Sequence, residues 1–251
     1  MSSPSLRPPT LPASRQSPRG NRLLAALPRR DYQRLVPRLE PVVLSAGWTL
    51  HGAGEPERHV YFPTSGLVCR FHVTADGACT GFAVTGSEGM IGVATFLGGE
   101  STLSQSVVLC DGHAFRMGAD RLRDALEAGG ELAQVLMRYT QALIAQTGQV
   151  AVCARHHPIK QRACFWILEC VDRLRSNELP VTQETIAEIV GVRRESITHA
   201  MGQLQRDNLV RCHRGGISVL DHGGLEAEAC ECYSVVRTEH ERLFSHAAHT
   251  D

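Results

Sequence analysis

The stretch Thr182–Met201, TQETIAEIVGVRRESITHAM, decides how this chain is organised. Its spacing predicts two short helices separated at Gly191, because a helix end favours a residue that accepts a positive φ. The apolar residues expected to face inward are Ile186, Ile189, Val190, Ile197, Ala200 and Met201. The second helix opens with polar side chains that can hydrogen-bond base edges and phosphates. The pattern predicts a helix-turn-helix whose second helix reads DNA.

The residues after this motif extend it. Leu204 and Leu209 continue the apolar spacing, and residues 210–220 are typical of two short strands joined by a glycine turn. Basic side chains in this predicted wing are placed to touch phosphates, namely Arg211, His213 and Arg214. An ordinary helical hairpin with a solvated polar face is the alternative. The added hairpin favours a winged helix-turn-helix.

Composition limits the class of protein. The 251 residues suffice for two modest domains, and 43% hydrophobic content is ordinary for a globular chain. No apolar run approaches the ~18 residues that a membrane span requires, and the start lacks the apolar core of a secretory signal. We therefore expect a cytoplasmic protein with no membrane partner, and we expect its nine cysteines to be reduced thiols. The formal net charge is zero, so affinity for DNA must come from local charge.

The N-terminal half predicts a small-ligand barrel. Residues 1–20 are rich in Pro, Ser and Arg and predict a disordered basic tail. Residues 21–129 form the expected sensing domain, which opens with two short helices around Pro28. Short apolar runs separated by glycine-bearing turns then predict roughly eight strands. A β barrel or sandwich of this size can hold one small ligand.

Residues 130–157 predict one long helix with an apolar seam. We expect the seam to pair with the same helix of a second copy, which would set two reading helices about 34 Å apart for successive major grooves. The alternative is that the helix packs only on its own barrel. The predicted dimer residues are Leu132, Val135, Leu136, Tyr139, Leu143 and Val150, with Gly148 allowing close approach. Residues 158–251 form the predicted DNA-binding domain, including helices at 159–174 and 225–244.

The order of these parts resembles the Crp/Fnr family of bacterial transcription regulators. The resemblance spans roughly residues 22–240 and is carried by YFPTSG at 61–66, EGMIG at 88–92 and the motif at 182–197. It implies an α+β fold with an N-terminal jelly-roll-like β barrel, a long dimerisation helix and a C-terminal winged helix-turn-helix. It also implies a homodimer on a two-fold DNA operator, with RNA polymerase as a further partner.

The same resemblance assigns the DNA contacts. Arg194 and Glu195 match the principal base and phosphate readers of the family, whereas His199 stands where most members carry arginine. An imidazole is a weaker partner for guanine or phosphate than a guanidinium, so the preferred operator is expected to differ from the common half-site. The predicted DNA-binding residues are Thr182, Arg193, Arg194, Glu195, Thr198, His199 and Arg214.

The barrel departs from the cyclic-nucleotide-binding members. Val93 stands where their ribose-binding glutamate belongs, and Ser104 and Ser106 occupy the neighbourhood of their phosphate-binding arginine. No basic residue lies between Arg70 and Arg116 to neutralise a cyclic phosphate, which would be costly to bury unpaired. We predict that the protein does not bind cAMP in the way those members do, and that the barrel senses a signal that the sequence does not identify. The candidate effector pocket consists of Glu88, Gly92, Val93, Ser104 and Ser106.

Other chemistry is less favoured. Cysteine and histidine side chains brought together by folding would make a haem- or thiol-based sensor of the same fold, from the set Cys69, Cys79, Cys110, Cys153, His113, His156 and His157. The Cys230-Glu-Cys232 spacing differs from a CxxC zinc knuckle and predicts a structural role without metal. A barrel metalloenzyme would need a His-x-His pair, which the barrel lacks, so no catalytic residue is predicted. A regulator that responds to no ligand remains a further alternative.

Overall fold

The computed structural model describes residues 17–245. Of the tail predicted at 1–20, residues 1–16 lie outside the described residues. Within residues 17–20, Pro18–Gly20 forms a 3-10 helix whose N-cap is Ser17. The two helices expected around Pro28 are present as α1 (Arg22–Ala25) and α2 (Arg29–Leu35), followed by a 3-10 turn at Val36–Arg38.

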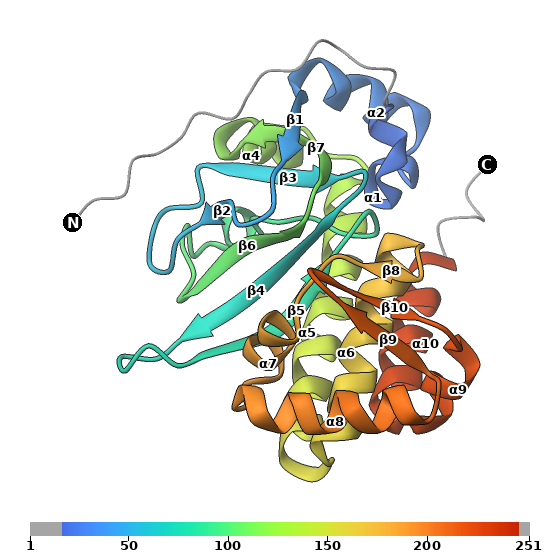
Figure 1. The fold of residues 1–251 in the computed structure, drawn as a ribbon. Helices are drawn as coiled ribbons and strands as arrows, with labels where there is room; N and C mark the ends of the chain where they lie inside the picture. The colour runs from blue at the N-terminus through green and yellow to red at the C-terminus, as the bar shows by residue number, and fades with distance from the viewer. Residues whose placement is uncertain (1–16, 246–251) are drawn as a thin grey trace.

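The N-terminal domain consists of two antiparallel sheets, as the jelly-roll-like barrel prediction required (Figure 1). One sheet has the strand order β1-β7-β3 and the other β2-β6-β4-β5. The strands are β1 (Glu40–Leu44), β2 (Thr49–His51), β3 (His59–Pro63), β4 (Leu67–Val73), β5 (Cys79–Thr85), β6 (Ser104–Cys110) and β7 (Gly112–Gly118). Seven strands thus lie within the described part of this domain, against roughly eight expected. The short helices α3 (Ala94–Leu97) and α4 (Ala119–Glu127) complete it.

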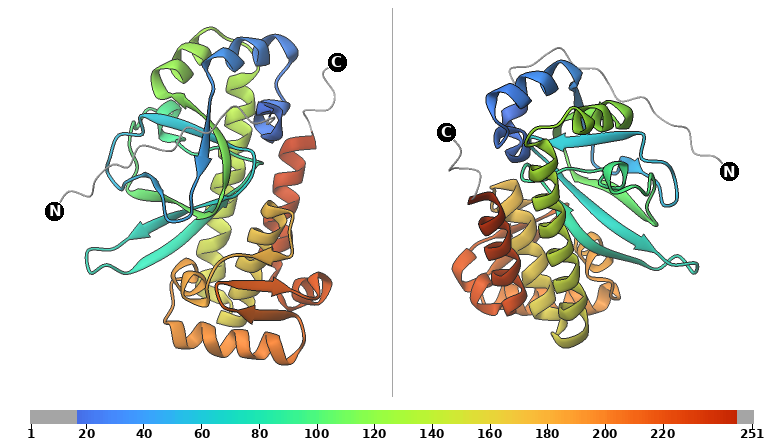
Figure 2. Two further views of the ribbon diagram at one scale, coloured as in Figure 1. Left: turned by 45° about the horizontal axis from the view of Figure 1, so that its top comes forward. Right: turned by 180° about the vertical axis from the view of Figure 1, so that it is seen from behind.

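The long helix predicted at 130–157 is α5 (Leu132–His156). Seen from behind, it runs in front of the sheets and continues beside the helices of the lower half of the molecule (Figure 2, right). Tyr139 projects from α5 into the barrel, where its hydroxyl donates to the Met90 carbonyl oxygen at 2.9 Å. A Cβ on Gly89 would lie 2.5 Å from the Tyr139 ring, so this close approach requires a glycine. Helix and barrel are therefore packed as one body.

The C-terminal module contains a three-stranded sheet and five helices. Its helices are α6 (Ile159–Leu174), α7 (Gln183–Val190), α8 (Arg194–Arg206), α9 (His222–Glu228) and α10 (Glu231–Ser245). The wing strands β9 (Val210–His213) and β10 (Gly216–Val219) are as predicted, but β8 (Glu178–Leu179) adds a third strand that the sequence reading missed. Two residues pair in β8, which is too short to leave a periodic signal.

The single closing helix predicted at 225–244 is wrong. Two helices are present instead, because the chain becomes extended at Ala229, with φ −74° and ψ 162°. Apolar residues continue across this break at helical spacing, so the periodicity gave no sign of it. The break lets α10 turn back and lie beside α5 (Figure 2).

The barrel and the C-terminal module share a hydrophobic core. Barrel residues such as Cys69 and Phe71 belong to the same buried cluster as Trp166 of α6 and Ile189 of α7. A Cβ on Gly81 of β5 would lie 3.2 Å from the Ile189 Cα, so α7 rests closely on the β5 backbone. Helix α8 lies beyond α7, at the end of the molecule opposite α1 and α2 (Figure 1). None of the helices among residues 17–245 has both the length and the apolarity to cross a membrane.

Candidate DNA-binding surface and effector site

The helix-turn-helix is built as its sequence predicts. Thr182 is the N-cap of α7, and its hydroxyl oxygen accepts from the Thr185 backbone N–H at 3.1 Å. Gly191 ends α7 at φ +70°, and the N–H groups of Gly191 and Val192 both donate to the Ala187 carbonyl oxygen. All six residues predicted to face inward are buried. The turn therefore holds α8 at a fixed angle to α7.

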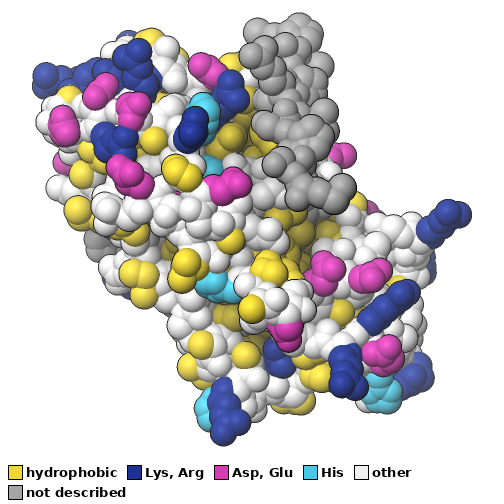
Figure 3. Space-filling view, turned by 90° about the vertical axis from the view of Figure 1, so that its left-hand side faces the viewer, with side chains coloured by type: hydrophobic (Ala, Val, Ile, Leu, Met, Phe, Trp, Pro, Cys, Tyr) yellow, Lys and Arg dark blue, Asp and Glu magenta, His cyan; other side chains and the backbone are white. Residues whose placement is uncertain are grey.

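Helix α8 keeps its polar face in solvent. Arg193, Arg194 and Glu195 at its start are exposed, as are Thr198 and His199 one turn later. Ile197, Ala200, Met201 and Leu204 are buried on the opposite face. The His199 Nε2 atom lies 3.2 Å from the Gln203 Nε2, which keeps the ring along the helix. In Figure 3, Lys and Arg side chains lie both at the upper left and over the lower part of the molecule, with acidic side chains among them.

The wing presents further basic groups. Arg211 and Arg214 are exposed on and beside β9, and Gly215 makes the turn at φ +85°. Glu178 holds the base of the wing, because its carboxylate accepts from the Ser218 hydroxyl at 2.8 Å. Every residue predicted to contact DNA is thus exposed on the surface formed by α7, α8 and the wing. Thr182 combines this exposure with its capping role.

The residues predicted for the dimer seam do not lie on the exposed face of α5. The structure buries them inside one protomer, against the barrel and α6; they are Leu132, Val135, Leu136, Tyr139, Leu143 and Val150. Helix α5 has a second stripe at heptad spacing that is exposed, consisting of Met137, Gln141, Ile144, Gly148 and Ala151. Apolar spacing detects both stripes and does not tell which one meets a partner. The alternative reading, in which the seam packs on its own barrel, describes the buried stripe.

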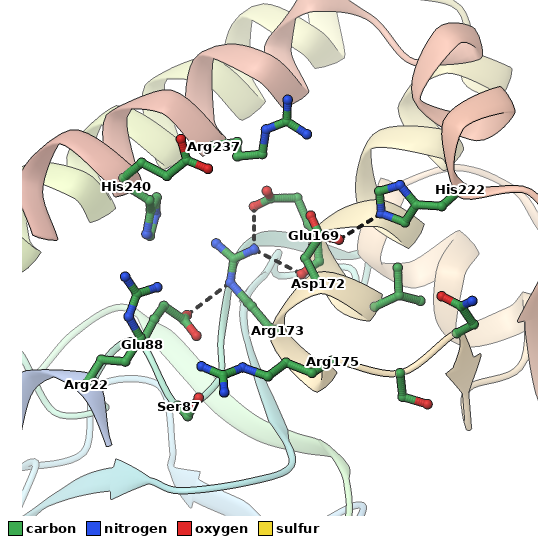
Figure 4. Close-up of a pocket in the computed structure, with 14 residues that line it drawn as sticks. Arg22, Ser87, Glu88, Glu169, Asp172, Arg173, Arg175, His222, Arg237 and His240 are labelled. Atoms are coloured by element: carbon green, nitrogen blue, oxygen red, sulfur yellow. Dashed lines mark hydrogen bonds and ion pairs between the residues drawn. The ribbon is translucent and has the colours of Figure 1, made fainter. Parts of the chain in front are cut away.

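Glu88, predicted for the effector pocket, instead faces the C-terminal module. Its carboxylate accepts from Arg173 Nε at 3.0 Å, and Arg173 Nη1 lies 3.0 Å from Glu169 Oε2 (Figure 4). Gln146 of α5 donates to the same Glu169 oxygen at 2.7 Å. Burial opposes the charge on Arg173, but Glu169 and Glu88 raise its pKa above the ordinary value. Glu88, Glu169 and Arg173 line a cavity of about 440 Å³ between barrel and module, together with Arg22, Arg175, His222 and His240.

The other predicted pocket residues are in the barrel but differ in their surroundings. Ser104 and Ser106 are buried on β6, and Gly92 has φ +102°, which favours glycine. Val93 packs in the core that the barrel shares with α5. Of the five residues predicted for the effector pocket, Ser104 and Ser106 are therefore the ones that place a polar side chain inside the barrel.

Sequence reasoning missed three buried polar residues beside these serines. Arg70 of β4 pairs across the sheet with Ser106, which in turn pairs with His51 of β2. Glu57 lies against them, since its Oε1 is 3.6 Å from His51 Nδ1, and its Oε2 accepts from the Ala94 N–H at 2.9 Å. Arg70 is 4% exposed, and its Nη2 has no hydrogen-bond partner among the described residues. The sequence did offer one sign of this group, because Arg70 interrupts the apolar residues of β4.

The cysteines and histidines considered for haem do not form one pocket. Cys69 and Cys110 are buried in the shared core, where burial raises the pKa of the Cys110 thiol to about 12. His113 is on β7 and His156 is exposed at the end of α5. Cys153 and His157 do come together, in the company of Cys230 and Cys232.

Comparisons with known proteins agree with this architecture. The family model for the cyclic nucleotide-binding domain matches residues 41–128, and the model for the Crp-like helix-turn-helix domain matches residues 161–228. The two matches together cover more than half of the chain.

Curated relatives and solved structures point the same way. The CRP-like cAMP-activated global transcriptional regulator of Mycobacterium tuberculosis is 23% identical over 202 residues, covering 78% of this chain and 90% of that protein. The global nitrogen regulator of Nostoc is 23% identical over 181 residues, covering 68% and 81%. The structure of FixK2 from Bradyrhizobium japonicum has the same fold, with a TM-score of 0.66 at 16% identity, covering 76% of this chain and 98% of that one.

These relatives are transcription regulators, and none is named as an enzyme. The family matches, the order of domains and the exposed reading helix confirm the resemblance inferred from the sequence. The chain is a transcription regulator that belongs to the Crp/Fnr family.

Proposed function

We propose that the protein is a cytoplasmic homodimer that binds a two-fold DNA operator and recruits or blocks RNA polymerase in response to a small molecule held by the barrel. The observation that carries the proposal is the start of α8, where Arg193, Arg194 and Glu195 are exposed together on a rigid helix. Arginine reads guanine through two hydrogen bonds, and glutamate accepts from the cytosine amino group. Thr198, His199, Thr182 and the wing residue Arg214 flank them for phosphate or base contacts.

The proposed dimer uses the exposed stripe of α5. Met137, Ile144 and Ala151 lie two helical turns apart along it, and a Cβ on Gly148 would meet nothing within 4 Å. Two such helices related by a two-fold axis would bury these side chains and place one reading helix in each of two half-sites.

Replacing Arg194 and Glu195 together with alanine tests the assignment. Each lost base contact should weaken specific binding by about 1–3 kcal/mol, so the double variant should lose operator selectivity while keeping its oligomeric state. Operator fragments are first recovered by sequencing the genomic DNA that the protein binds in its host. Arg206→Ala is the matched control, because Arg206 is exposed at the far end of α8. Unchanged operator affinity in the double variant would overturn the assignment.

The proposed signal is a small molecule other than cAMP. Val93 in the core, where the ribose-binding glutamate of other members belongs, supports the exclusion of cAMP. Arg70, whose Nη2 is buried without a hydrogen-bond partner among the described residues, supports an effector that carries a hydrogen-bond acceptor. A charged group left unpaired in a protein interior is costly, so an acceptor on the effector would stabilise Arg70. Isothermal titration should show no micromolar binding of cAMP to the purified chain. Micromolar binding at the barrel would contradict this part of the proposal.

The proposed mechanism is a population shift. In the described arrangement α7 rests on β5, so a signal in the barrel can favour or disfavour this contact. Reorientation of the two modules about the α5 pair would then change the separation of the two reading helices.

A further inference from the structure

Four side chains that bind metals well meet where α5 ends and α10 begins. Cys153 and His157 are four residues apart at the end of α5, which places them on one side of the helix. Cys230 and Cys232 flank Glu231, the first residue of α10. The three Sγ atoms and one imidazole nitrogen all lie within 4.8 Å of one another.

Their spacing matches a tetrahedral site. The Sγ atoms of Cys153 and Cys230 are 3.5 Å apart, and Cys232 Sγ is 3.4 Å from His157 Nδ1. Zinc–sulfur bonds of about 2.3 Å in tetrahedral geometry separate two sulfur ligands by about 3.8 Å, and a sulfur from a nitrogen ligand by slightly less. These two distances are close to the tetrahedral values, and all four atoms lie within 4.8 Å of one another, so side-chain adjustments of up to about an ångström would let a single ion reach all four.

The surroundings are those of a ligated site. All three cysteines are buried and His157 is half-buried, so the four ligands leave little room for water at the centre. On the far side of the ring, His157 Nε2 lies 3.3 Å from the Glu231 carboxylate, which orients the imidazole with Nδ1 toward the sulfurs. The Gln149 amide donates to Cys232 Sγ at 3.2 Å. Both neighbours favour a thiolate–imidazole centre.

We propose that Cys153, His157, Cys230 and Cys232 bind one Zn²⁺ as a structural site. Three thiolates and one imidazole are a ligand set typical of structural zinc, and four protein ligands leave no open position for catalysis. Each thiol that binds the ion releases its proton to solvent. The short Cys-x-Cys spacing does not prevent this, because the other two ligands come from a helix 77 residues away.

The position of the site gives it a clear consequence. The Crp-like helix-turn-helix domain spans residues 161–228, and the two ligand pairs lie immediately before and after it in the chain. A bound ion would therefore link the start and the end of the module to the C-terminal end of α5. Closing so long a loop removes conformational entropy from the unfolded chain, so the ion stabilises the module where it joins the long helix.

The metal content of the full-length chain, purified with a thiol reductant, tests the proposal. We expect one zinc ion per chain by elemental mass spectrometry. Replacement by Co²⁺ should give the visible absorption of tetrahedral cobalt and a thiolate-to-cobalt charge-transfer band in the near ultraviolet. Removal of the ion by a strong chelator should lower the melting temperature, and added Zn²⁺ should restore it.

Variants identify the ligands. Cys232→Ser and His157→Gln should each weaken zinc binding at least tenfold, whereas Cys212→Ser should keep one ion, because Cys212 lies in the wing outside the group. If the ligand variants do not fold, the cobalt spectrum of the unaltered chain still decides the ligand type. A chain with reduced thiols that takes up no zinc would overturn the proposal, as would full zinc content in Cys232→Ser. A Cys153–Cys230 disulfide that persists in reductant would also overturn it. None of these measurements involves DNA, so they stand apart from the proposed operator binding.

Discussion

His51 shows how strongly the barrel interior acts on a single side chain. It is 6% exposed, and its Nε2 lies 2.8 Å from the His59 carbonyl oxygen. Burial, together with the nearby Arg70 charge, lowers the pKa of His51 to about 4. Burial also raises the pKa of Glu57, against the opposing charge of Arg70. At neutral pH His51 is therefore uncharged, and Arg70 supplies the positive charge of this buried group.

We predict that His51 makes the protein less stable in mild acid. Its pKa is lower folded than unfolded, so the unfolded chain binds more protons as the pH falls below about 6.5, and stability is lost until about pH 4. Between pH 7 and pH 5 this histidine should remove about 2 kcal/mol from the free energy of unfolding. Urea titrations at both pH values measure the loss.

The control for this prediction is His51→Gln, which keeps a donor for the His59 carbonyl oxygen but does not titrate. Its loss of stability between pH 7 and pH 5 should be smaller than that of the unaltered chain. Glu57 acts in the opposite direction, because its raised pKa favours the folded state as the pH falls, and it is present in both proteins. Equal losses in the two proteins would contradict the prediction.

At the scale of the element, α5 carries two apolar stripes with different tasks. The buried stripe includes Tyr139 and Leu143 and fastens the helix to the barrel. The other stripe leaves Met137 and Ile144 each 67% exposed. Gln141, between them, donates to Glu239 of α10 at 3.3 Å, which marks where α10 borders the exposed stripe.

We predict that Ile144→Glu separates the proposed dimer without unfolding the protomer. In a two-fold pair this substitution would place one carboxylate from each copy near the axis, and desolvation and like charge would oppose association by several kcal/mol. A penalty of about 3 kcal/mol raises the dissociation constant about 100-fold. Sedimentation equilibrium measures it. Leu103→Glu is the control, because Leu103 is 82% exposed on a barrel loop away from α5; equal dimer strength in both variants would exclude this stripe as the interface.

The elements that the sequence could predict are those specified by local contacts. Thr182, Gly191 and the apolar face of α8 fix the helix-turn-helix within about twenty residues, so periodicity and capping residues suffice to find it. The Glu88–Arg173 pair spans 85 residues and the Cys153–Cys230 contact spans 77. Such contacts depend on how the elements pack, and no spacing in one sequence reveals them. For the same reason, apolar spacing alone did not show that the predicted stripe of α5 is the one buried within the protomer.

At the scale of the whole molecule, the barrel and the DNA-binding module are joined by charge as well as by apolar packing. Arg173 of α6 contacts Glu88 of the barrel and Glu169 of its own helix, and its side chain is only 8% exposed. The shared core continues from β4 and β5 into α6 and α7. A conformational change in one domain would therefore alter the contacts of the other, whether or not DNA is bound.

The two tryptophans of the chain report on the two parts separately. Trp48 lies in the barrel, with its ring edge-on to Tyr61 at 6.0 Å between centroids, and Trp166 is buried in α6. Trp166→Phe leaves the barrel probe, and Trp48→Phe leaves the module probe. Because the core is shared, we expect each protein to unfold in a single cooperative transition, in which its tryptophan fluorescence and its circular dichroism change at the same urea concentration.

We predict that Arg173→Met breaks this coincidence. Removing the guanidinium leaves two buried carboxylates, Glu88 and Glu169, without their cation, which should cost about 3–5 kcal/mol. The substitution weakens the junction between the two parts, so in the protein that keeps Trp166 the fluorescence should change at lower urea concentration than the circular dichroism of the whole chain. Arg237→Met is the control, because Arg237 lines the same cavity but is 42% exposed in its pair with Glu226, and should cost less than about 1 kcal/mol. Coincident transitions in Arg173→Met would show that apolar packing alone couples the two parts.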